Sequence, residues 1–279
     1  MHRLHAIALF AFCLVASVPQ AFAIEDGERL KIAGARLSAA VRVGDVDADG
    51  PTCSGMLITP YHVLTAAHCP ARCAMSVLLG SRNEAGTERA IIEGSLRHPG
   101  FVMSDRGDTI FDAKVVRLFT PLYPRDLRGR AKQNYRRELV RYGPQIFVDH
   151  RAMVFGYGIT SEADREDGRL SDEDLQDIGY LRIGQFEVGD PAFLNMKLES
   201  LDARLQGGDS GAAIVVPSHN QTGVLEDYQI IGIVSTIKGG DAFGPPSGYI
   251  KRWVDAVVAG NHAPSLCPAA VSNVATGTW

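Results

Sequence analysis

A serine flanked by glycines, in the stretch Gly207-Gly208-Asp209-Ser210-Gly211, is the residue of this chain best suited to attack a carbonyl carbon. Glycines let a tight turn and a substrate backbone approach closely. Such a turn aims backbone N–H groups at one point, where a negatively charged oxygen can be held. The alternative is an ordinary turn before a strand. A serine hydroxyl also needs a base and an orienting acid, so the rest of the chain has to supply a histidine and a carboxylate.

The elements that would position these groups are mostly short strands. Apolar and β-branched runs alternate with Gly, Asn and Pro, and helical periodicity is nearly absent in the first half. This pattern predicts an all-β barrel or sandwich. One helix is predicted at Ile250–Ala259, with Trp253, Val254, Val257 and Val258 on its apolar face. The expected strands are 37–43, 56–58, 63–65, 76–79, 89–92, 114–118, 153–155, 180–183, 214–216 and 229–236.

Composition allows one large core or two smaller ones, with 46% hydrophobic residues in 279. The formal net charge of −4 gives no positive field to hold phosphates. We therefore expect no nucleic-acid partner.

Residues 1–23 have the features of a secretory signal peptide: Arg3, an apolar run at residues 6–18 and small residues at 21–23. The alternative is a buried N-terminal helix. Since no later stretch is long and apolar enough to span a bilayer, we expect a secreted or periplasmic protein with no membrane partner.

Four cysteines remain once Cys13 leaves with the signal: Cys53, Cys69, Cys73 and Cys267. An even number in an oxidising compartment predicts disulfides, and four cysteines allow three pairings. Zinc is the competing interpretation, but the spacing of paired zinc ligands is missing. We expect no metal and no cofactor.

Two stretches interrupt the strand pattern. Tyr123–Tyr142 is basic and is predicted to be a linker with some helix, whereas Ser161–Asp177 is acidic and is predicted to be an exposed loop. Calcium is an alternative for the acidic loop, although the alternating spacing of a calcium loop is absent. The expected units are therefore a first barrel at 24–122, a linker at 123–150, a second barrel with the helix at 151–260, and a tail at 261–279.

The candidate base is His68, in the motif Val63-Leu64-Thr65-Ala66-Ala67-His68-Cys69 that follows Cys53-Ser54-Gly55. This arrangement closely resembles the trypsin/chymotrypsin family. In that family the two cysteines form a bridge beside the catalytic histidine. The resemblance therefore implies a Cys53–Cys69 bond, which leaves Cys73 and Cys267 as the second pair.

The candidate acid is Asp112, because Asp112-Ala113-Lys114-Val115-Val116-Arg117-Leu118 resembles the family's strand that carries the catalytic aspartate. Asp108 and Asp105 compete. Asp112 is preferred because the apolar run and the basic residue before Leu118 stand at the right offset. Lys114 is unusual in a strand next to such an acid.

The order His68, Asp112, Ser210 is that of the trypsin/chymotrypsin family and differs from that of subtilisins and α/β-hydrolases. The resemblance implies two antiparallel six-stranded β-barrels with the site in the cleft between them and a C-terminal helix. It also implies that His68 takes the Ser210 proton, Asp112 orients His68, and the N–H groups of Gly208 and Ser210 form the oxyanion hole. The general mechanism of this triad is known from the same family.

The substrate-binding residues depart from the family's pattern. Ser235 lies in a segment that resembles the strand lining the substrate groove, but Arg204 stands where trypsins keep an aspartate. Ile237 and Ser247 are expected where trypsins have glycines. Cleavage after Lys or Arg is therefore not implied. Small side chains should fit best, and an acidic one becomes possible if Arg204 points inward.

An activation pair is also implied. In this family a new N-terminal ammonium pairs with the aspartate before the nucleophile, which is Asp209 here. Signal removal would leave Ile24 as the first residue, with Gly27 at the fourth position. The alternative is a later cut before Ile32.

The resulting hypothesis is a secreted serine endopeptidase that acts on protein or peptide substrates. We expect it to be a monomer and to bind protein inhibitors. One alternative is a catalytically inactive homologue that binds proteins through the same cleft. A serine esterase of the α/β-hydrolase type is disfavoured by the order of the triad and by Ala212, which breaks its motif.

Overall fold

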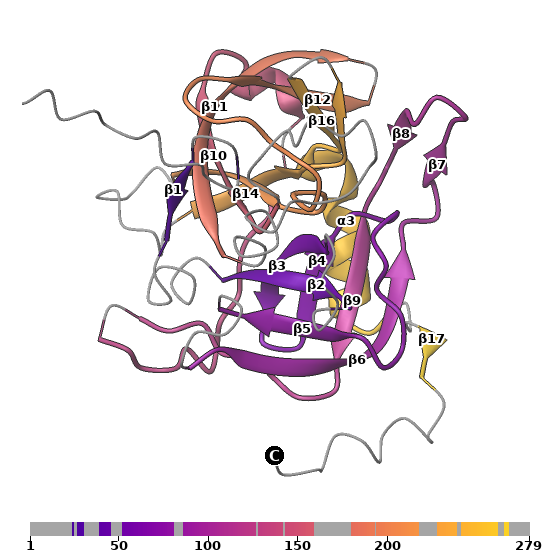
Figure 1. Ribbon diagram of the computed structural model, residues 1–279. Helices are drawn as coiled ribbons and strands as arrows, with labels where there is room; N and C mark the ends of the chain where they lie inside the picture. Colours follow the sequence, from indigo (N-terminus) through magenta and orange to yellow (C-terminus); the bar gives the residue numbers. More distant parts are fainter. Residues whose placement is uncertain are drawn as a thin grey trace, which may run out of the picture.

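The computed structural model shows a mostly β protein with one α-helix, arranged as two groups of strands (Figure 1). It describes residues 24, 27–30, 39–45, 52–80, 86–126, 128–141, 143–158, 180–192, 194–217, 228–238, 241–261 and 265–267. The proposed signal peptide and the acidic stretch Ser161–Asp177 lie outside these residues. No helix within them is long and apolar enough to cross a membrane.

The first group of strands forms a closed antiparallel barrel, coloured indigo to magenta in Figure 1. Its strands pair in the order β6-β5-β2-β3-β4-β9, and pairing of β6 with β9 closes the ring. They are β2 (Ala40–Gly44), β3 (Cys53–Thr59), β4 (His62–Thr65), β5 (Ser76–Leu79), β6 (Glu88–Arg97) and β9 (Lys114–Leu118). Closure leaves no exposed sheet edge in this ring.

The tail is tied to this first barrel. Strand β17 (Ser265–Leu266) pairs with β6, and a disulfide joins Cys267 to Cys73. This bond and the Cys53–Cys69 bond are the two pairs expected from the sequence. Residues 265–267 are therefore held against the first barrel.

The second group of strands follows the order β14-β13-β10-β11-β12-β16-β15. The first and last strands of this order, β14 and β15, are consecutive in the sequence and are separated only by Val234 and Ser235. The two ends of the strand order therefore lie next to each other. The short strand β1 (Glu28–Arg29) pairs with β11 outside this path. The strands of the path are β10 (Arg151–Gly156), β11 (Arg182–Ala192), β12 (Asn195–Ser200), β13 (Ala213–Pro217), β14 (Tyr228–Ile233), β15 (Thr236–Lys238) and β16 (Asp241–Gly244).

Three clusters of buried apolar side chains stabilise this arrangement. One fills the first barrel and another the second. The third joins them, because it includes Met56 and Leu64 of the first barrel, Phe155 and Ile233 of the second, and Val254 of the helix. Burial of apolar side chains is the main favourable term in folding, so this shared core fixes the position of one barrel against the other.

The remaining elements are short. Helix α3 (Ser247–Val258) packs on the shared core through Ile250, Val254 and Val257 and begins three residues before the predicted helix. Strands β7 (Val102–Met103) and β8 (Thr109–Ile110) form a hairpin that projects from the first barrel (Figure 1). The described part of the basic stretch Tyr123–Tyr142 contains no helix, and a 3-10 turn, η1 (Pro144–Phe147), follows it within the linker.

Candidate active site

His68 and Asp112 are brought together by the pairing of β4 with β9. In this pairing the last residue of β4, Thr65, lies opposite the first residue of β9, Lys114. His68 follows Thr65 by three residues, and Asp112 precedes Lys114 by two, so the two side chains come together at this end of the strands. The Nδ1 atom of His68 lies 2.7 Å from Oδ2 of Asp112, and the backbone N–H of His68 donates to Oδ1 at 3.0 Å. Two hydrogen bonds to one carboxyl group fix both the backbone and the ring of His68.

Asp112 is fully buried but surrounded by donors. Burial by itself raises the pKa of Asp112. Hydrogen bonds from His68 and from the Ser235 hydroxyl, together with the charge of His68, more than compensate and hold the pKa below its usual range. The buried hydroxyl of Thr109 in turn contacts Oγ of Ser235 at 2.7 Å. Asp112 is therefore ionised and firmly oriented at neutral pH.

The competing aspartate is far more exposed. The side chain of Asp108 is 63% exposed and forms an ion pair with Lys238. That ion pair links the hairpin of β7 and β8 to strand β15 of the second barrel. The structure thus places Asp112, and not Asp108, against His68.

Ser210 lies in a turn that is fastened to the first barrel by Ser54 of β3. The backbone N–H of Ser54 donates to the Ser210 carbonyl at 2.9 Å, and Oγ of Ser54 donates to the Gly208 carbonyl at 2.8 Å. The same hydroxyl accepts from the N–H of Tyr157 at 2.9 Å. Ser54 is fully buried. Through these bonds it connects β3 of the first barrel with the Ser210 turn and with the segment that contains Tyr157. Sequence reasoning missed this role, although Ser54 stands inside the motif Cys53-Ser54-Gly55.

Two glycines shape this turn. Gly208 and Gly211 have φ values of +98° and +85°, a region that favours glycine. A Cβ atom on Gly211 would also collide with the Thr65 hydroxyl. Among the described residues, neither the N–H of Gly208 nor that of Ser210 donates to a backbone carbonyl. These two groups are therefore available to an oxygen bound at the turn.

The hydroxyl of Ser210 makes only one weak contact among the described residues. Its Oγ lies 3.5 Å from the Ser235 carbonyl, which is at the limit of a hydrogen bond. Within the described residues no hydrogen bond joins Ser210 to His68. Catalytic hydrogen bonds are often long before substrate binds and shorten only in the complex.

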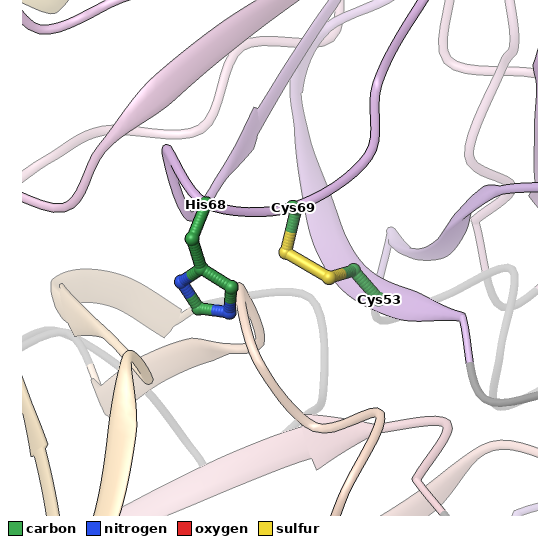
Figure 2. Close-up of side chains that lie close together, drawn as sticks. All are labelled: Cys53, His68 and Cys69. Atoms are coloured by element: carbon green, nitrogen blue, oxygen red, sulfur yellow. A yellow bond between two sulfur atoms is a disulfide. The ribbon is translucent and has the colours of Figure 1, made fainter. Parts of the chain in front are cut away.

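The Cys53–Cys69 disulfide lies directly beside the imidazole ring of His68 (Figure 2). The two sulfur atoms and a ring nitrogen are close enough to share one metal ion. Metals, however, bind thiolates, and both sulfurs are bonded to each other. We interpret the Cys53–Cys69 disulfide as a structural bond that fixes the segment carrying His68.

Asp209 is the second fully buried carboxyl group of the site. It lies against Gly156 and Gly158, where any side chain would collide with it. Burial raises the pKa of Asp209 to about 7, while N–H donors from Gln206 and Gly158 and the charge of Arg182 oppose the rise. The glycines of the stretch Val154–Gly158 are thus explained by the carboxyl group that they enclose.

Ile24 is buried in the core of the second barrel. Its carbonyl accepts from Gly27 at 2.6 Å, and a Cβ atom on Gly27 would come within 2.8 Å of the same carbonyl. Its φ of +43° is strained for a β-branched residue. Neighbouring Gly184 and Phe186 belong to strand β11, so Ile24 and the enclosure of Asp209 belong to the same barrel.

The expected substrate-binding residues are only partly brought together. Ile237 is exposed on β15, and Ala242 of β16 lies opposite it. Arg204 is exposed.

The expectation for Ser247 is wrong. Ser247 is fully buried at the start of α3, and its hydroxyl donates to the Val140 carbonyl at 2.9 Å. Counting positions along the sequence did not point to Ala242, because the register between β15 and β16 cannot be derived from a single sequence.

Comparison with known proteins gives the family. Residues 24–256 match the family described as Trypsin. The chain belongs to the trypsin family. It is 28% identical to a trypsin of Simulium vittatum over 194 residues, which cover 66% of this chain and 69% of that protein. The fold is also that of a scabies mite inactivated protease paralogue, with a TM-score of 0.60, 17% identity, and coverage of 86% of this chain and all of that one.

Replacement of Ser54 by alanine should loosen the Ser210 turn. The Ser54→Ala variant leaves the Tyr157 N–H and the Gly208 carbonyl without their partner, which costs about 1–3 kcal/mol of unfolding free energy. Ser200→Ala is the matched control, since it also removes one hydroxyl bonded to a backbone carbonyl. Urea unfolding and labelling of Ser210 by a fluorophosphonate measure both effects. Equal loss of labelling in the two variants would contradict this role.

Proposed function

We propose that this member of the trypsin family is a secreted serine endopeptidase that hydrolyses peptide bonds through Ser210, His68 and Asp112. The observation that carries the proposal is the double hydrogen bond between His68 and Asp112, beside a glycine-bounded serine turn. A disulfide-containing trypsin-family domain also fits a secreted or periplasmic location. Protein or peptide substrates, protein inhibitors and a monomeric state remain expectations from the family.

The geometry supports the following steps. Asp112 accepts from Nδ1 of His68, so Nε2 is left as the base for the Ser210 proton. The hydroxyl oxygen then attacks the substrate carbonyl carbon, and the carbonyl oxygen becomes negative. The free N–H groups of Gly208 and Ser210 would stabilise that oxygen. His68 returns the proton to the leaving amine, and water repeats the sequence on the acyl-enzyme.

One observation favours the alternative of an inactive, protein-binding homologue. Ser210 contacts the Ser235 carbonyl, and the described residues show no bond from it to His68. The structurally similar mite protein is named as inactivated, but at 17% identity it shows the fold alone. Retention of His68, Asp112 and the two glycines in positive φ supports the active enzyme instead.

Substitutions in the triad separate these functions. Ser210→Ala should abolish fluorophosphonate labelling and peptide hydrolysis while the protein stays folded. Asp112→Asn should lower kcat about 10⁴-fold, because the amide favours the wrong tautomer of His68. Asp108→Asn is the matched control and should retain activity, since Asp108 is exposed and bonded to Lys238. A wild-type protein that fails to react with the probe would support the binding function.

The substrate preference follows from the side chains beside Ser235. Ile237 and Ala242 face each other across β15 and β16, at positions where a bulky substrate side chain would need space. In the described sheet β15 pairs only with β16, so its other edge can pair with an extended peptide. We therefore expect small side chains at the cleaved position and no cleavage after Lys or Arg.

Enlarging this region should change the preference. Ile237→Gly should increase cleavage after Leu or Phe relative to Ala by about tenfold or more, since one or two methylene groups contribute 1–3 kcal/mol to such discrimination. Ile237→Leu keeps the volume and serves as control. A peptide library with a varied cleaved position measures the ratio. Efficient hydrolysis of an arginyl anilide by the wild-type protein would refute the assignment.

We also propose that cleavage before Ile24 activates the enzyme. The strain at Ile24 arises between its side chain and the preceding carbonyl, so hydrolysis of that peptide bond removes it. The new ammonium would lie in the same barrel as Asp209 and could pair with it. Burial raises the pKa of Asp209 to about 7, so a cation placed beside this carboxyl group would stabilise its charged form. A cut before Ile32 remains the alternative.

This proposal predicts a pH dependence that cleavage removes. In the uncut chain the pKa of Asp209 is about 7 when folded and 3.8 when unfolded. The stability from the bound proton is therefore full below pH 4 and is lost as the pH rises through about 7, by at most about 4 kcal/mol. Pairing with the Ile24 ammonium would lower the folded pKa and reduce this loss.

Urea unfolding between pH 4 and 8 tests the prediction in the uncut chain, in the chain that begins at Ile24, and in Asp209→Asn versions of both. The variant isolates the contribution of this carboxyl group. Identical pH profiles for the two wild-type forms, or full activity with an alanine added before Ile24, would disprove activation at this bond.

A further inference from the structure

A cavity of about 370 Å³ lies beside His68 on the first barrel, outside the serine turn. It is bounded by the segment His68–Cys73, by the end of strand β6 and by Lys114 of β9. None of the steps above uses this space. Its lining includes the cations Lys114, Arg72 and Arg97, and no carboxylate lines it.

Lys114 is the buried member of this group. Its side chain is only 3% exposed, and Nζ donates to the carbonyl of Cys69, the residue after His68. The pKa of Lys114 is lowered to about 8, chiefly by burial and also by the charges of Arg97 and Arg72, while the charge of Asp112 opposes the shift. An ammonium group has three hydrogens, so the Cys69 carbonyl leaves donors of Lys114 for a ligand in the cavity.

The two arginines are exposed at the rim of the cavity. Arg97 lies 5.9 Å from the ring of Phe101, and within the described residues neither arginine pairs with a carboxylate. Asp112 attracts Lys114, but its oxygens already accept from His68 and Ser235. Three cations of the first barrel therefore meet around one space without a matching negative charge.

A purely structural role accounts for only part of this arrangement. The bond from Lys114 to Cys69 would support the segment that carries His68, and for that Lys114 alone would suffice. It does not require two guanidinium groups at the same cavity, where they make the charged form of Lys114 less favourable. Repulsion of this kind is relieved by a bound anion.

We propose that this cavity is a binding site for an oxyanion group, a carboxylate or a phosphate, held by Lys114, Arg72 and Arg97. A guanidinium group offers parallel N–H donors that match two oxygens of either group. The volume accommodates a free phosphate ion or the acidic side chain of a bound peptide. Because His68 borders the cavity, an acidic side chain close to the cleaved bond would reach it.

Titration calorimetry with inorganic phosphate, at constant ionic strength in chloride, tests the site without any need for activity. The wild-type protein should bind one phosphate saturably. Arg72→Gln and Arg97→Gln should each weaken binding about tenfold, as loss of a charge-assisted hydrogen bond does. Lys114→Met should abolish it, and Arg252→Gln on the exposed face of α3 is the charge-matched control.

The outcomes are distinct. Saturable binding that the Arg72→Gln/Arg97→Gln double variant loses and Arg252→Gln keeps supports the site. Absence of saturable binding, or binding that the double variant retains, overturns it. This decision does not depend on the proposed peptidase function, since both arginines are exposed and neither belongs to the triad.

The source of the oxyanion is then found with peptide pairs that differ only by Asp or Asn near the cleaved bond; this step rests on the proposed function. If the site takes a substrate carboxylate, the Asp peptides should be cleaved about tenfold faster, phosphate should compete with them, and the double variant should lose the difference. Equal rates for both peptides would assign the site to a free anion.

Discussion

The burial of two carboxyl groups, Asp112 and Asp209, is the constraint on which the site depends. A buried charge is costly unless it is paired and hydrogen-bonded. Asp112 meets this condition with donors from His68 and Ser235, and its pKa is lowered. Asp209 has two N–H donors and the charge of Arg182 nearby, but burial outweighs them and its pKa rises to about 7. The surroundings of Asp112 therefore favour its charged form, whereas burial favours the neutral form of Asp209.

The glycines around Asp209 and Ser210 are explained by close contacts and by the backbone conformation of the turn. Gly156 and Gly158 lack side chains because the carboxyl group of Asp209 takes their space. Gly208 and Gly211 allow the turn on either side of Asp209 and Ser210 to adopt positive φ. The shared apolar core holds the two barrels together, so that a donor from one barrel meets an acceptor of the other.

The sequence predicted the all-β class, the helix and the residues that meet at His68, because each depends on local patterns. Cys53, His68 and Asp112 stand in motifs that can be recognised along the sequence without knowing how the strands pair. Ser247 was misplaced for the opposite reason. The segment between Ile237 and the helix contains strand β16, and only its pairing shows that Ala242 lies opposite Ile237. Ser54 was missed because its three partners come from distant parts of the chain.

Ser54 shows how such long-range contacts can determine the chemistry. Its hydroxyl joins the Tyr157 N–H and the Gly208 carbonyl, and its own N–H holds the Ser210 carbonyl. The N–H groups of Gly208 and Ser210 in the same turn have no backbone acceptors in the described chain. Both sides of the Ser210 turn are thus set from β3, the strand that also begins with the disulfide partner of Cys69. Strand β3 therefore contacts both the segment that carries His68 and the turn that carries Ser210, and it fixes where the two segments meet.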